Sequence, residues 1–471
     1  MGDLSRPDGA PEDHAVSTRD AACLAALLAV FVAATALAPP IFTRGEAREG
    51  LVMQSLVAGG DWVIPRREGI LASKPPLFHW VAAGAATLVG DGDLAARLPS
   101  ALAGWAMLVA TFMLGTTLFE RRRAWVAVGA LAATAGFWPA AIQARVDMVF
   151  AAAIASALTG LAVWQHTGRP SGRSVLYLAT AAAVLTKGPA GAVLVGAILV
   201  AALAGRRDGR SLWDVIAIGP ILAAGATVLG WYGLAYRHAG WEFIEVQLVH
   251  ENLSRAVGFG SFARQRRHHP FKMLEAFATW LFPWNLALFG TWRLPRTWAR
   301  RFLHAWWMVT LAFFTVAAGK RSIYLLPLYP AIALLAADVL LTRLAWRPWM
   351  SVALGAWALG LATATVVGMR HDAARSTLRA FVEGVQTIVP ATATVGIRGS
   401  VNENDRLVLA YRLHRPVPRV LVGKAAPDFL VVRRAEAATV APACESRVAW
   451  PTDEGLVLVA CPHGSAADEH R

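Results

Sequence analysis

Charged residues are scarce in this chain. Asp, Glu, Lys and Arg make up only 16% of its 471 residues, whereas 56% are hydrophobic. A soluble domain has about 25% charged residues, so the composition excludes an ordinary soluble globular protein. Apolar runs of about 18 or more residues recur from Ala21 to Gly368, and each is long enough to cross a bilayer as a helix. The sequence therefore predicts an α-helical integral membrane protein.

Nucleotide-binding motifs are also missing. Phe314 stands where the first glycine of a phosphate-binding loop would precede Gly319 and Lys320, and no G-x-G-x-x-G follows a predicted strand. These absences argue against a nucleotide-sugar substrate. The formal charge of +14 does not indicate nucleic acid either, because the arginines form short clusters between apolar spans. We expect no nucleic-acid partner.

The arginine clusters predict how the chain is oriented. They occupy every second connection, as cytoplasmic loops do, and lie near residues 121–123, 169–173, 206–210, 293–301 and 343–347. This parity predicts about eleven crossings, with the N-terminus inside and the C-terminus outside. The crossings begin near residues 21, 98, 124, 147, 174, 189, 212, 270, 302, 322 and 349.

Two segments near the N-terminus are not counted as crossings. Residues Pro76 to Val89 number about 14, fewer than the roughly 20 that a span requires, and we expect a helix on or dipping into the outer leaflet. Residues 1–20 are polar with several acidic groups, which indicates a disordered cytoplasmic leader instead of a cleaved signal peptide. The predicted transmembrane domain therefore extends over residues 21–368.

Residues 369–471 predict a small soluble α/β domain outside the membrane. A helix is expected at 378–389, and strands at 393–398, 420–422, 429–433 and 456–461. Cys444 and Cys461 bracket two strand-like segments that could form a hairpin, and a disulfide and two buried thiols are equally compatible with the sequence. Cys23 is expected to pack within the first span.

Ionisable groups collect on the predicted outer side. They lie in outer loops at 42–97 and 237–269, in the Arg145-Val146-Asp147 turn, at Lys187 and at Lys320-Arg321. Lys187 stands between two apolar stretches, where a structural turn needs no cation, and a buried anion is its natural partner. Asp147 opens a span and could instead cap that helix.

These groups together predict a wet, outward-facing cavity. Its cations would be Arg48, Lys74, Lys187, Arg255, Lys320 and Arg321. So many cations indicate a phosphate, and their apolar surroundings indicate that the phosphate carries a lipid tail. In a transporter the charges would be expected near the membrane midplane, whereas these lie at the outer rim.

Several short motifs occur in an informative order. They are GEAREGLVMQSLVAGGDWVIP and SKPPLFHW in the first outer loop, then RLPSALAG, ARVDM, LTKGPAG, VHENLSR, LFPW and GKRSIYLLPLYPAIALLA. Over residues 20–345 the chain resembles the polytopic GT-C glycosyltransferases, specifically the family of the lipid A aminoarabinose transferases and, more distantly, the protein O-mannosyltransferases. The resemblance implies transfer of a sugar, with inversion, from a polyprenyl phosphate to an acceptor on the outer membrane face.

The resemblance also implies a catalytic base in the first outer loop. The family has an Asp-Glu pair two residues ahead of an Arg; here the Arg is Arg48 and the Glu is Glu46, but Gly45 replaces the Asp. Either Glu46 accepts the proton, which we favour, or Asp147 takes a larger part than orienting the sugar or the lysines.

The remaining site residues follow from the same motifs. Lys74 and Lys187 match the family's donor-binding lysines, and Arg48, Arg255 and Arg321 are expected to assist them. The residues expected near the substrate are His250, Asn252 and Tyr324. Ser73 replaces the Glu that precedes the first lysine in metal-binding relatives, so no metal or other cofactor is expected; zinc held by His250, His268 and His269 is the weaker alternative.

The sequence is compatible with three functions to different degrees. The favoured one is a multi-pass inner-membrane glycosyltransferase that uses an undecaprenyl-phosphate-linked sugar and modifies lipid A, another envelope glycan or a protein. A carrier or flippase for a lipid-linked sugar would use the same cations but would need no base. A membrane scaffold whose C-terminal domain binds partners gives no reason for Lys187.

Overall fold

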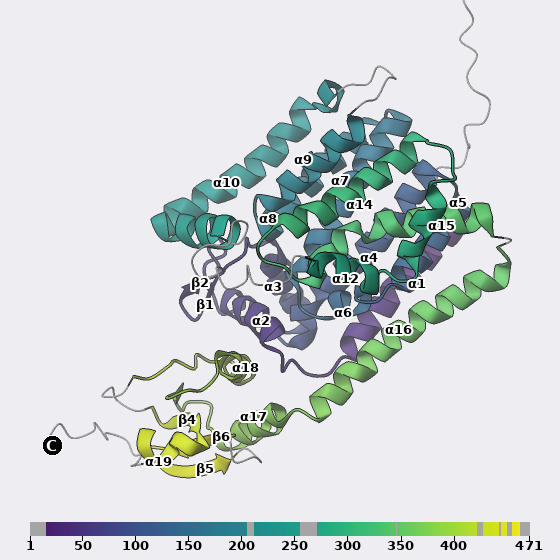
Figure 1. The fold of residues 1–471 in the computed structure, drawn as a ribbon. Helices are drawn as coiled ribbons and strands as arrows, with labels where there is room; N and C mark the ends of the chain where they lie inside the picture. The colour runs from purple at the N-terminus through teal and green to yellow at the C-terminus, as the bar shows by residue number, and fades with distance from the viewer. Residues whose placement is uncertain are drawn as a thin grey trace, which may run out of the picture. The chain divides into compact units, whose positions relative to one another are not determined.

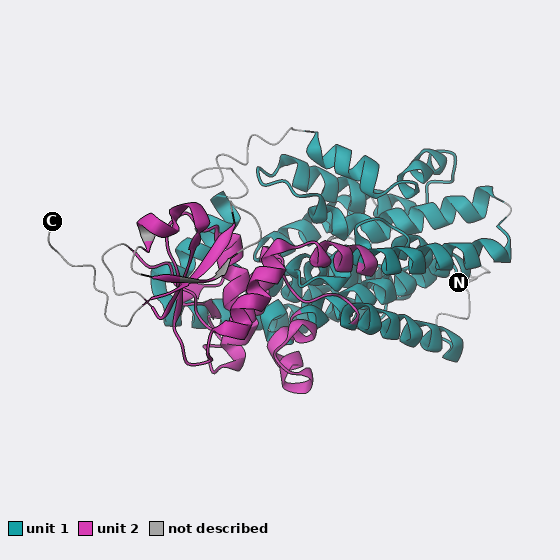
Figure 2. Ribbon diagram, turned by 90° about the horizontal axis from the view of Figure 1, so that it is seen from below, with its two compact units in different colours: residues 1–36, 73–81, 97–365 teal, residues 37–72, 82–96, 366–471 magenta. Residues whose placement is uncertain are grey.

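The computed structural model describes residues 16–204, 212–254, 271–344, 346–421, 427–441, 444–449 and 455–461. These residues form two compact units, coloured teal and magenta in Figure 2. The first unit contains residues 1–36, 73–81 and 97–365, and the second contains residues 37–72, 82–96 and 366–471. The second unit thus includes parts of the predicted first outer loop in addition to the C-terminal region. Each unit is described by itself.

The first unit is built from helices (Figure 1). The α-helices that lie wholly or largely in it are α1 (Thr18–Ala36), α4 (Asp93–Leu118), α5 (Arg121–Ala132), α6 (Phe137–Ile142), α7 (Val146–Thr167), α8 (Pro170–Lys187), α9 (Ala190–Leu203), α10 (Ile218–Phe243), α12 (Lys272–Trp280), α13 (Ala287–Thr291), α14 (Trp298–Val316), α15 (Tyr329–Arg343) and α16 (Pro348–Ala374). Tighter or wider helical turns link them: η1 (Leu212–Val215), the π-helix η2 (Ile244–Ser254), η4 (Trp284–Leu286) and η5 (Ser322–Leu328).

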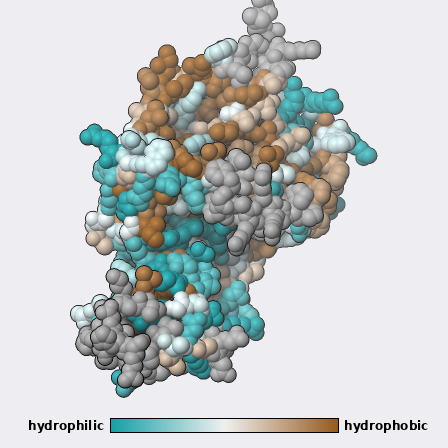
Figure 3. Space-filling model, turned by 60° about the vertical axis from the view of Figure 1, so that its left-hand side comes forward, coloured by the Kyte–Doolittle hydropathy of each residue, from teal (hydrophilic) through white to brown (hydrophobic). Residues whose placement is uncertain are grey.

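The apolar surface of these helices confirms a polytopic membrane protein. Among the described residues, six helical stretches are long and apolar enough to cross a membrane: Thr18–Ala36, Asp93–Leu118, Val146–Thr167, Ile218–Ser254, Ser322–Arg343 and Pro348–Ala374. Large apolar side chains on them are open to the surroundings; Leu229 and Val352, for example, are each 72% exposed. Figure 3 shows such hydrophobic surface in brown. Side chains of this kind are stable in contact with lipid tails.

Two predicted segments differ from the structure. The span expected from residue 270 is divided into α12, η4 and α13, and the break lies beside Pro283, which cannot donate a backbone hydrogen bond and restricts the residue before it. The prediction of a loop at 237–269 is wrong for residues 237–254. There α10 continues to Phe243, and η2 follows it to Ser254. Gly240, with a φ of 55°, provides the change of direction within this helical stretch. Residues 255–269 lie outside the described residues.

Buried ion pairs hold three helices of the first unit together. Arg300 of α14 donates from Nε and Nη2 to the two carboxylate oxygens of Asp338 in α15, at 2.6 and 3.2 Å. Nε of Arg123 in α5 lies 3.1 Å from Oδ1 of the same carboxylate, which is fully buried. Two of the arginine clusters that predict cytoplasmic loops therefore also connect helices.

The second unit contains a small sheet and the helices around it. Its helices are α2 (Arg44–Val57), most of α3 (Leu77–Val89), α17 (Thr377–Ile388), α18 (Glu403–Leu413), the short η6 (Arg434–Glu436) and α19 (Ala437–Val440). A two-stranded ribbon pairs β1 (Arg66–Arg67) with β2 (Ile70–Leu71). The larger sheet has the order β3-β4-β6-β5, formed by β3 (Val395–Ile397), β4 (Phe429–Arg433), β5 (Glu445–Ala449) and β6 (Leu456–Ala460).

Most of the predicted C-terminal elements are present. The helix expected at 378–389 and the strands expected at 393–398, 429–433 and 456–461 correspond to α17, β3, β4 and β6. β3 pairs parallel to β4, and the other neighbours are antiparallel. In the segment expected as a strand at 420–422, the backbone of Val420 donates a hydrogen bond to Ile397, but residue 422 lies outside the described residues. The two strand-like segments expected between Cys444 and Cys461 are β5 and β6, which pair as an antiparallel hairpin, whereas α18 was not predicted from the sequence.

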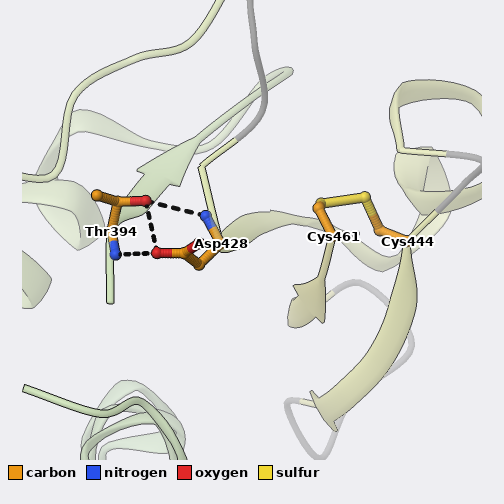
Figure 4. Close-up of a disulfide and its surroundings, with 4 residues drawn as sticks. All are labelled: Thr394, Asp428, Cys444 and Cys461. Atoms are coloured by element: carbon orange, nitrogen blue, oxygen red, sulfur yellow. Dashed lines mark hydrogen bonds between the residues drawn. A yellow bond between two sulfur atoms is a disulfide. The ribbon is translucent and has the colours of Figure 1, made fainter. Parts of the chain in front are cut away.

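A disulfide closes the last hairpin (Figure 4). Cys444 precedes β5 and Cys461 follows β6, and their sulfur atoms are bonded. Beside the hairpin, the Asp428 carboxylate accepts hydrogen bonds from the backbone N–H and the hydroxyl of Thr394, at 2.6 and 2.9 Å. These contacts fix the start of β4 next to the start of β3.

The first outer segment packs onto α18 within the second unit. A Cβ atom at Gly50 of α2 would overlap the ring of Tyr411, so only glycine allows this close approach. Nη1 of Arg406 donates to Glu68 at 2.7 Å, and that guanidinium also binds Glu403. The segment that carries Glu46 is therefore structured and is not an open loop.

Candidate active site

A pocket of about 100 Å³ in the first unit contains two of the predicted lysines. Lys74 reaches it from the segment before α3, and Lys187 from the last residue of α8. The other polar or aromatic residues of its wall are Phe150, Glu251, Asn252, Phe313, Phe314 and Tyr324. Alanines and Gly319 complete the lining, so the two ammonium groups lie against a mainly apolar wall.

Lys187 is held by a carboxylate and two aromatic rings. Its Nζ donates to Oδ1 of Asp147 at 2.5 Å, and the two side chains are only 12% and 13% exposed. The same Nζ lies 4.1 Å from the centre of the Tyr324 ring and 5.0 Å from that of Phe150, where a cation is attracted by the ring face. Lys187 also stands at a helix C-terminus, where the helix dipole favours positive charge.

Lys74 has a separate carboxylate partner. Its Nζ donates to Oε2 of Glu251 at 2.5 Å, and both side chains are about one-tenth exposed. Glu251 belongs to the π-helix η2, whereas Lys74 precedes α3, so the pair joins segments 177 positions apart in the chain. Each lysine of the pocket therefore has an acidic residue as a hydrogen-bond partner.

This pairing determines what the pocket can do. Removing charges from water is costly, and a nearby opposite charge offsets only part of that cost. An ammonium is a compact charge with freely rotating donors, so it can exchange a carboxylate oxygen for a phosphate oxygen without a change of backbone position. The arrangement suits a site that receives an anion and later releases it.

The structure brings five of the predicted residues together. Lys74, Lys187, Asn252 and Tyr324 line the pocket, and Asp147 binds Lys187. Gly188 shapes this region: a Cβ there would lie 2.9 Å from the side-chain nitrogen of Asn252. That side chain donates to the Gln247 carbonyl at 2.5 Å. The hydrogen bond therefore holds the Asn252 side chain, and the glycine at position 188 leaves room for it.

The other predicted residues lie elsewhere. Arg321 is exposed and lines a different cavity of the first unit. His250 is also exposed, and its Nδ1 lies 3.7 Å from Oε1 of Glu251. Arg255, His268 and His269 lie outside the described residues. Among the residues that are described, no group of three or more His, Cys, Asp or Glu side chains could hold a metal ion. The expectation that no cofactor is needed stays a prediction.

Glu46 and Arg48 belong to the second unit, in the first turns of α2. Thr43 caps this helix: its hydroxyl donates to Oε2 of Glu46 at 3.1 Å and accepts the Glu46 backbone N–H at 3.4 Å. The Glu46 side chain is buried. Nε of Arg48 donates to Glu49 at 2.9 Å. Burial, and to a smaller extent the charge of Arg48, lowers the pKa of Arg67 in the same segment.

Two residues of the pocket, Glu251 and Phe150, are not predicted by the sequence motifs. Glu251 stands between His250 and Asn252, both of which were selected from the same motif, yet it is the residue that binds Lys74. An acidic residue within a helical stretch of the membrane domain was the available signal. Phe150 lies one turn after Asp147, but aromatic residues are too common in this chain to be informative on their own.

Comparisons with known proteins identify relatives for most of the chain. Residues 73–231 match the family described as dolichyl-phosphate-mannose-protein mannosyltransferase. An undecaprenyl phosphate-α-4-amino-4-deoxy-L-arabinose arabinosyl transferase of Pseudomonas fluorescens is 27% identical over 323 residues, which cover 63% of this chain and 54% of the relative. The transferase of the same description from Pseudomonas aeruginosa is 28% identical over 341 residues, covering 69% and 60%.

A solved structure extends the similarity over the fold. ArnT from Cupriavidus metallidurans bound to undecaprenyl phosphate superposes with a TM-score of 0.79 at 20% identity, covering 96% of this chain and 100% of that one. The matches to the curated relatives span only about 54–60% of their length. The chain therefore has the fold of this GT-C structure, and its sequence is similar to the aminoarabinose transferases and to the mannosyltransferase family.

Proposed function

We propose that this chain is an inverting glycosyltransferase that moves a sugar from a polyprenyl phosphate, such as undecaprenyl phosphate, to a lipid A-like, glycan or protein acceptor. One observation carries the proposal: two lysines, each paired with a carboxylate, face the same apolar pocket. The relatives are named for transfer from undecaprenyl phosphate, which supports this donor.

The charge balance of the reaction fits the two lysines. A polyprenyl phosphosugar is a phosphodiester with one negative charge, and its leaving group is a phosphomonoester that gains a second. Cations fixed beside the bridging oxygen stabilise that growing charge, and their effect is larger where water is excluded. We assign this role to Lys74 and Lys187, with Arg48 and Arg255 as assisting groups.

The acceptor hydroxyl needs a base. We assign this role to Glu46, on the resemblance of its segment to the family's first outer loop. Asp147 is already bound to Lys187, so we assign it the positioning of that lysine. Tyr324, Asn252 and His250 are the proposed contacts to the sugar, because the first two line the pocket and the third adjoins Glu251.

The proposed placement in the cell follows the charge pattern. The N-terminus would be in the cytoplasm, the transmembrane domain would extend over residues 21–368 of the inner membrane, and residues 369–471 would lie on the outer side. The disulfide between Cys444 and Cys461 supports that side, because such bonds persist in oxidising compartments.

Mass spectrometry of envelope lipids and glycans tests the activity. Cells that contain the intact chain should carry one sugar mass that is missing from cells without it, whereas identical spectra would contradict the proposal.

The Glu46→Gln variant separates a transferase from a carrier. A transferase should retain binding of polyprenyl phosphate and lose turnover, because only the proton acceptor is removed. If Glu46→Gln supports the wild-type amount of sugar modification, the assignment of the base is wrong.

A further inference from the structure

A second cavity of the first unit is lined by Arg321, a predicted donor-binding residue that does not line the pocket of Lys74 and Lys187. Its volume is about 580 Å³, and three basic side chains contribute to its wall: Arg145, Lys272 and Arg321. They come from the N-cap of α7, the first turn of α12 and the N-cap of η5. The remaining lining is Ala135, Gly136, Pro139, Ala140, Gln143, Trp280, Ser322 and Ile323.

The charges of this cavity are not balanced. Within the described part of the chain, none of the three basic side chains forms an ion pair, and the cavity wall contains no acidic residue. Arg145 donates from Nε to Oε1 of Gln143 at 2.9 Å, which orients the guanidinium. The acidic residue on which the Arg145 charge acts is Asp147, and that carboxylate is already bound to Lys187. Three cations that line one cavity repel one another, and an anion between them would offset that repulsion. A phosphate group, which accepts several charge-assisted hydrogen bonds, fits this requirement.

The rest of the wall suits a lipid. Alanines, Pro139, Ile323 and the ring of Trp280 make it mainly apolar. Gly136 has a φ of 80°, and a Cβ there would lie 2.6 Å from the Trp280 ring, so the ring can cover this part of the cavity only because the position is glycine. An amphiphile with a phosphate headgroup would satisfy both the cations and the apolar wall.

The same two segments contribute to both cavities. At the start of α7, Arg145 lines the second cavity, Asp147 binds Lys187, and Phe150 lines the first pocket. In the segment before α15, Gly319 and Tyr324 line the first pocket, whereas Arg321 lines the second. A ligand in either cavity therefore contacts backbone segments that also form the other.

We propose that the second cavity binds the phosphate of the acceptor, a phosphorylated lipid, while the donor phosphate occupies the pocket of Lys74 and Lys187. This inference rests on the proposed transferase function. It gives Arg321 a role separate from the donor site, and it adds Arg145 and Lys272 to the residues that determine which acceptor is used.

Native mass spectrometry with a soluble lipid phosphate tests the number of sites. The full chain, purified in dodecyl maltoside, is titrated with dioctanoyl phosphatidic acid. We expect two bound lipids on the wild type. The double variant Lys272→Gln/Arg321→Gln should lose one of them, with its affinity reduced at least tenfold, and Lys187→Gln should lose the other. Arg296→Gln, which removes an exposed arginine with no described partner, should retain both.

The outcomes separate this inference from the proposed function. The retained first lipid shows that the double variant is folded, and equal loss in Arg296→Gln would overturn the inference because it would indicate a general charge effect. Inorganic phosphate should compete weakly; if it displaces the second lipid at an equal concentration, the cavity does not recognise a lipid. If the double variant loses its second lipid, but cells that contain the intact chain show no transferred sugar, the lipid site is supported and the proposed transferase function is wrong.

Discussion

The first unit contains two kinds of buried ion pair, and they differ in the basic residue and in the space around it. Asp338 is bound by the guanidinium groups of Arg123 and Arg300. None of these three residues lines either of the two cavities described above. Lys74 and Lys187 are bound by Glu251 and Asp147 at the edge of a pocket. A planar guanidinium binds a carboxylate in a fixed geometry, whereas an ammonium can change partners. We infer that the arginine pairs connect helices, whereas the lysines of the other pairs exchange their carboxylate partners for a ligand when it binds.

The largest expected effect concerns the arginine pairs. Asp338→Asn removes the charge that Arg123 and Arg300 share, and breaking a buried pair costs about 3–5 kcal/mol because a charge is left uncompensated. We expect a lower unfolding temperature in detergent, measured by tryptophan fluorescence. Asp372→Asn is the control, since its side chain is 88% exposed. If both variants unfold like the wild type, Asp338 does not connect the helices.

The second effect concerns the pocket. Lys187→Gln should reduce sugar transfer by about 10²–10³-fold, the usual effect of removing one group that stabilises a transition-state charge. Its unfolding temperature should change less than that of Asp338→Asn. The measurement is single-turnover transfer, with enzyme and donor both in excess over the acceptor. If the variant keeps its turnover and loses only stability, Lys187 has a structural role like that of the arginine pairs, and the proposed difference between the two kinds of ion pair is wrong.

The third predicted effect is a gain in lipid binding, whereas the first two are losses of stability and of sugar transfer. Glu251→Gln removes the carboxylate that competes for Lys74, so the described groups of the pocket gain one positive charge. We expect polyprenyl phosphate to bind about tenfold more tightly, which is less than the roughly 4 kcal/mol of a full charge pair at 4 Å near a protein surface. Equilibrium binding of the labelled lipid measures it, with Glu251→Asp as the matched control. Weaker binding would instead show that Glu251 positions Lys74 for the phosphate.

The smallest effect concerns an ion pair of the second unit between the buried Arg406 and the partly exposed Glu403. Hydrogen bonds from Arg406 lower the pKa of Glu403, so this carboxylate stabilises the fold above its unfolded pKa and the stabilisation is lost as the pH falls through the lowered value. Since the Glu403 side chain is 41% exposed, we expect less than about 1 kcal/mol. The unfolding temperatures of the wild type and Glu403→Gln should converge between pH 7 and pH 3. A difference that grows at low pH would reverse the sign.

Much of the fold could be predicted because hydrophobic length and arginine clusters are local signals. Helix ends placed Asp147 at the start of α7 and Lys187 at the end of α8, and the structure joins the two side chains. Pro283 and Gly240 were harder to interpret, because a proline or glycine inside an apolar run can break a helix or merely bend it. The numbers of crossings and their orientation stay predictions.

The partners of the site residues could not be predicted in the same way. Glu251 was overlooked because its orientation depends on the π-helical turn of η2, which has no reliable sequence pattern. Arg321 and Tyr324 stand three positions apart, yet they line different cavities, since Arg321 has extended backbone angles just before η5. Contacts of this kind depend on backbone dihedral angles, which a motif does not encode.

Gly188 sets a limit on how the lysine beside it can vary. The residue has a φ of 84°, and a side chain there would press on both polar atoms of the Asn252 amide, at 2.9 and 3.0 Å. Any mutation of this glycine would be strained and would also require the Asn252 side chain to shift. Lys187 and Gly188 should therefore be conserved together. A homologue that has the lysine without the glycine is expected to have a different residue at the position of Asn252.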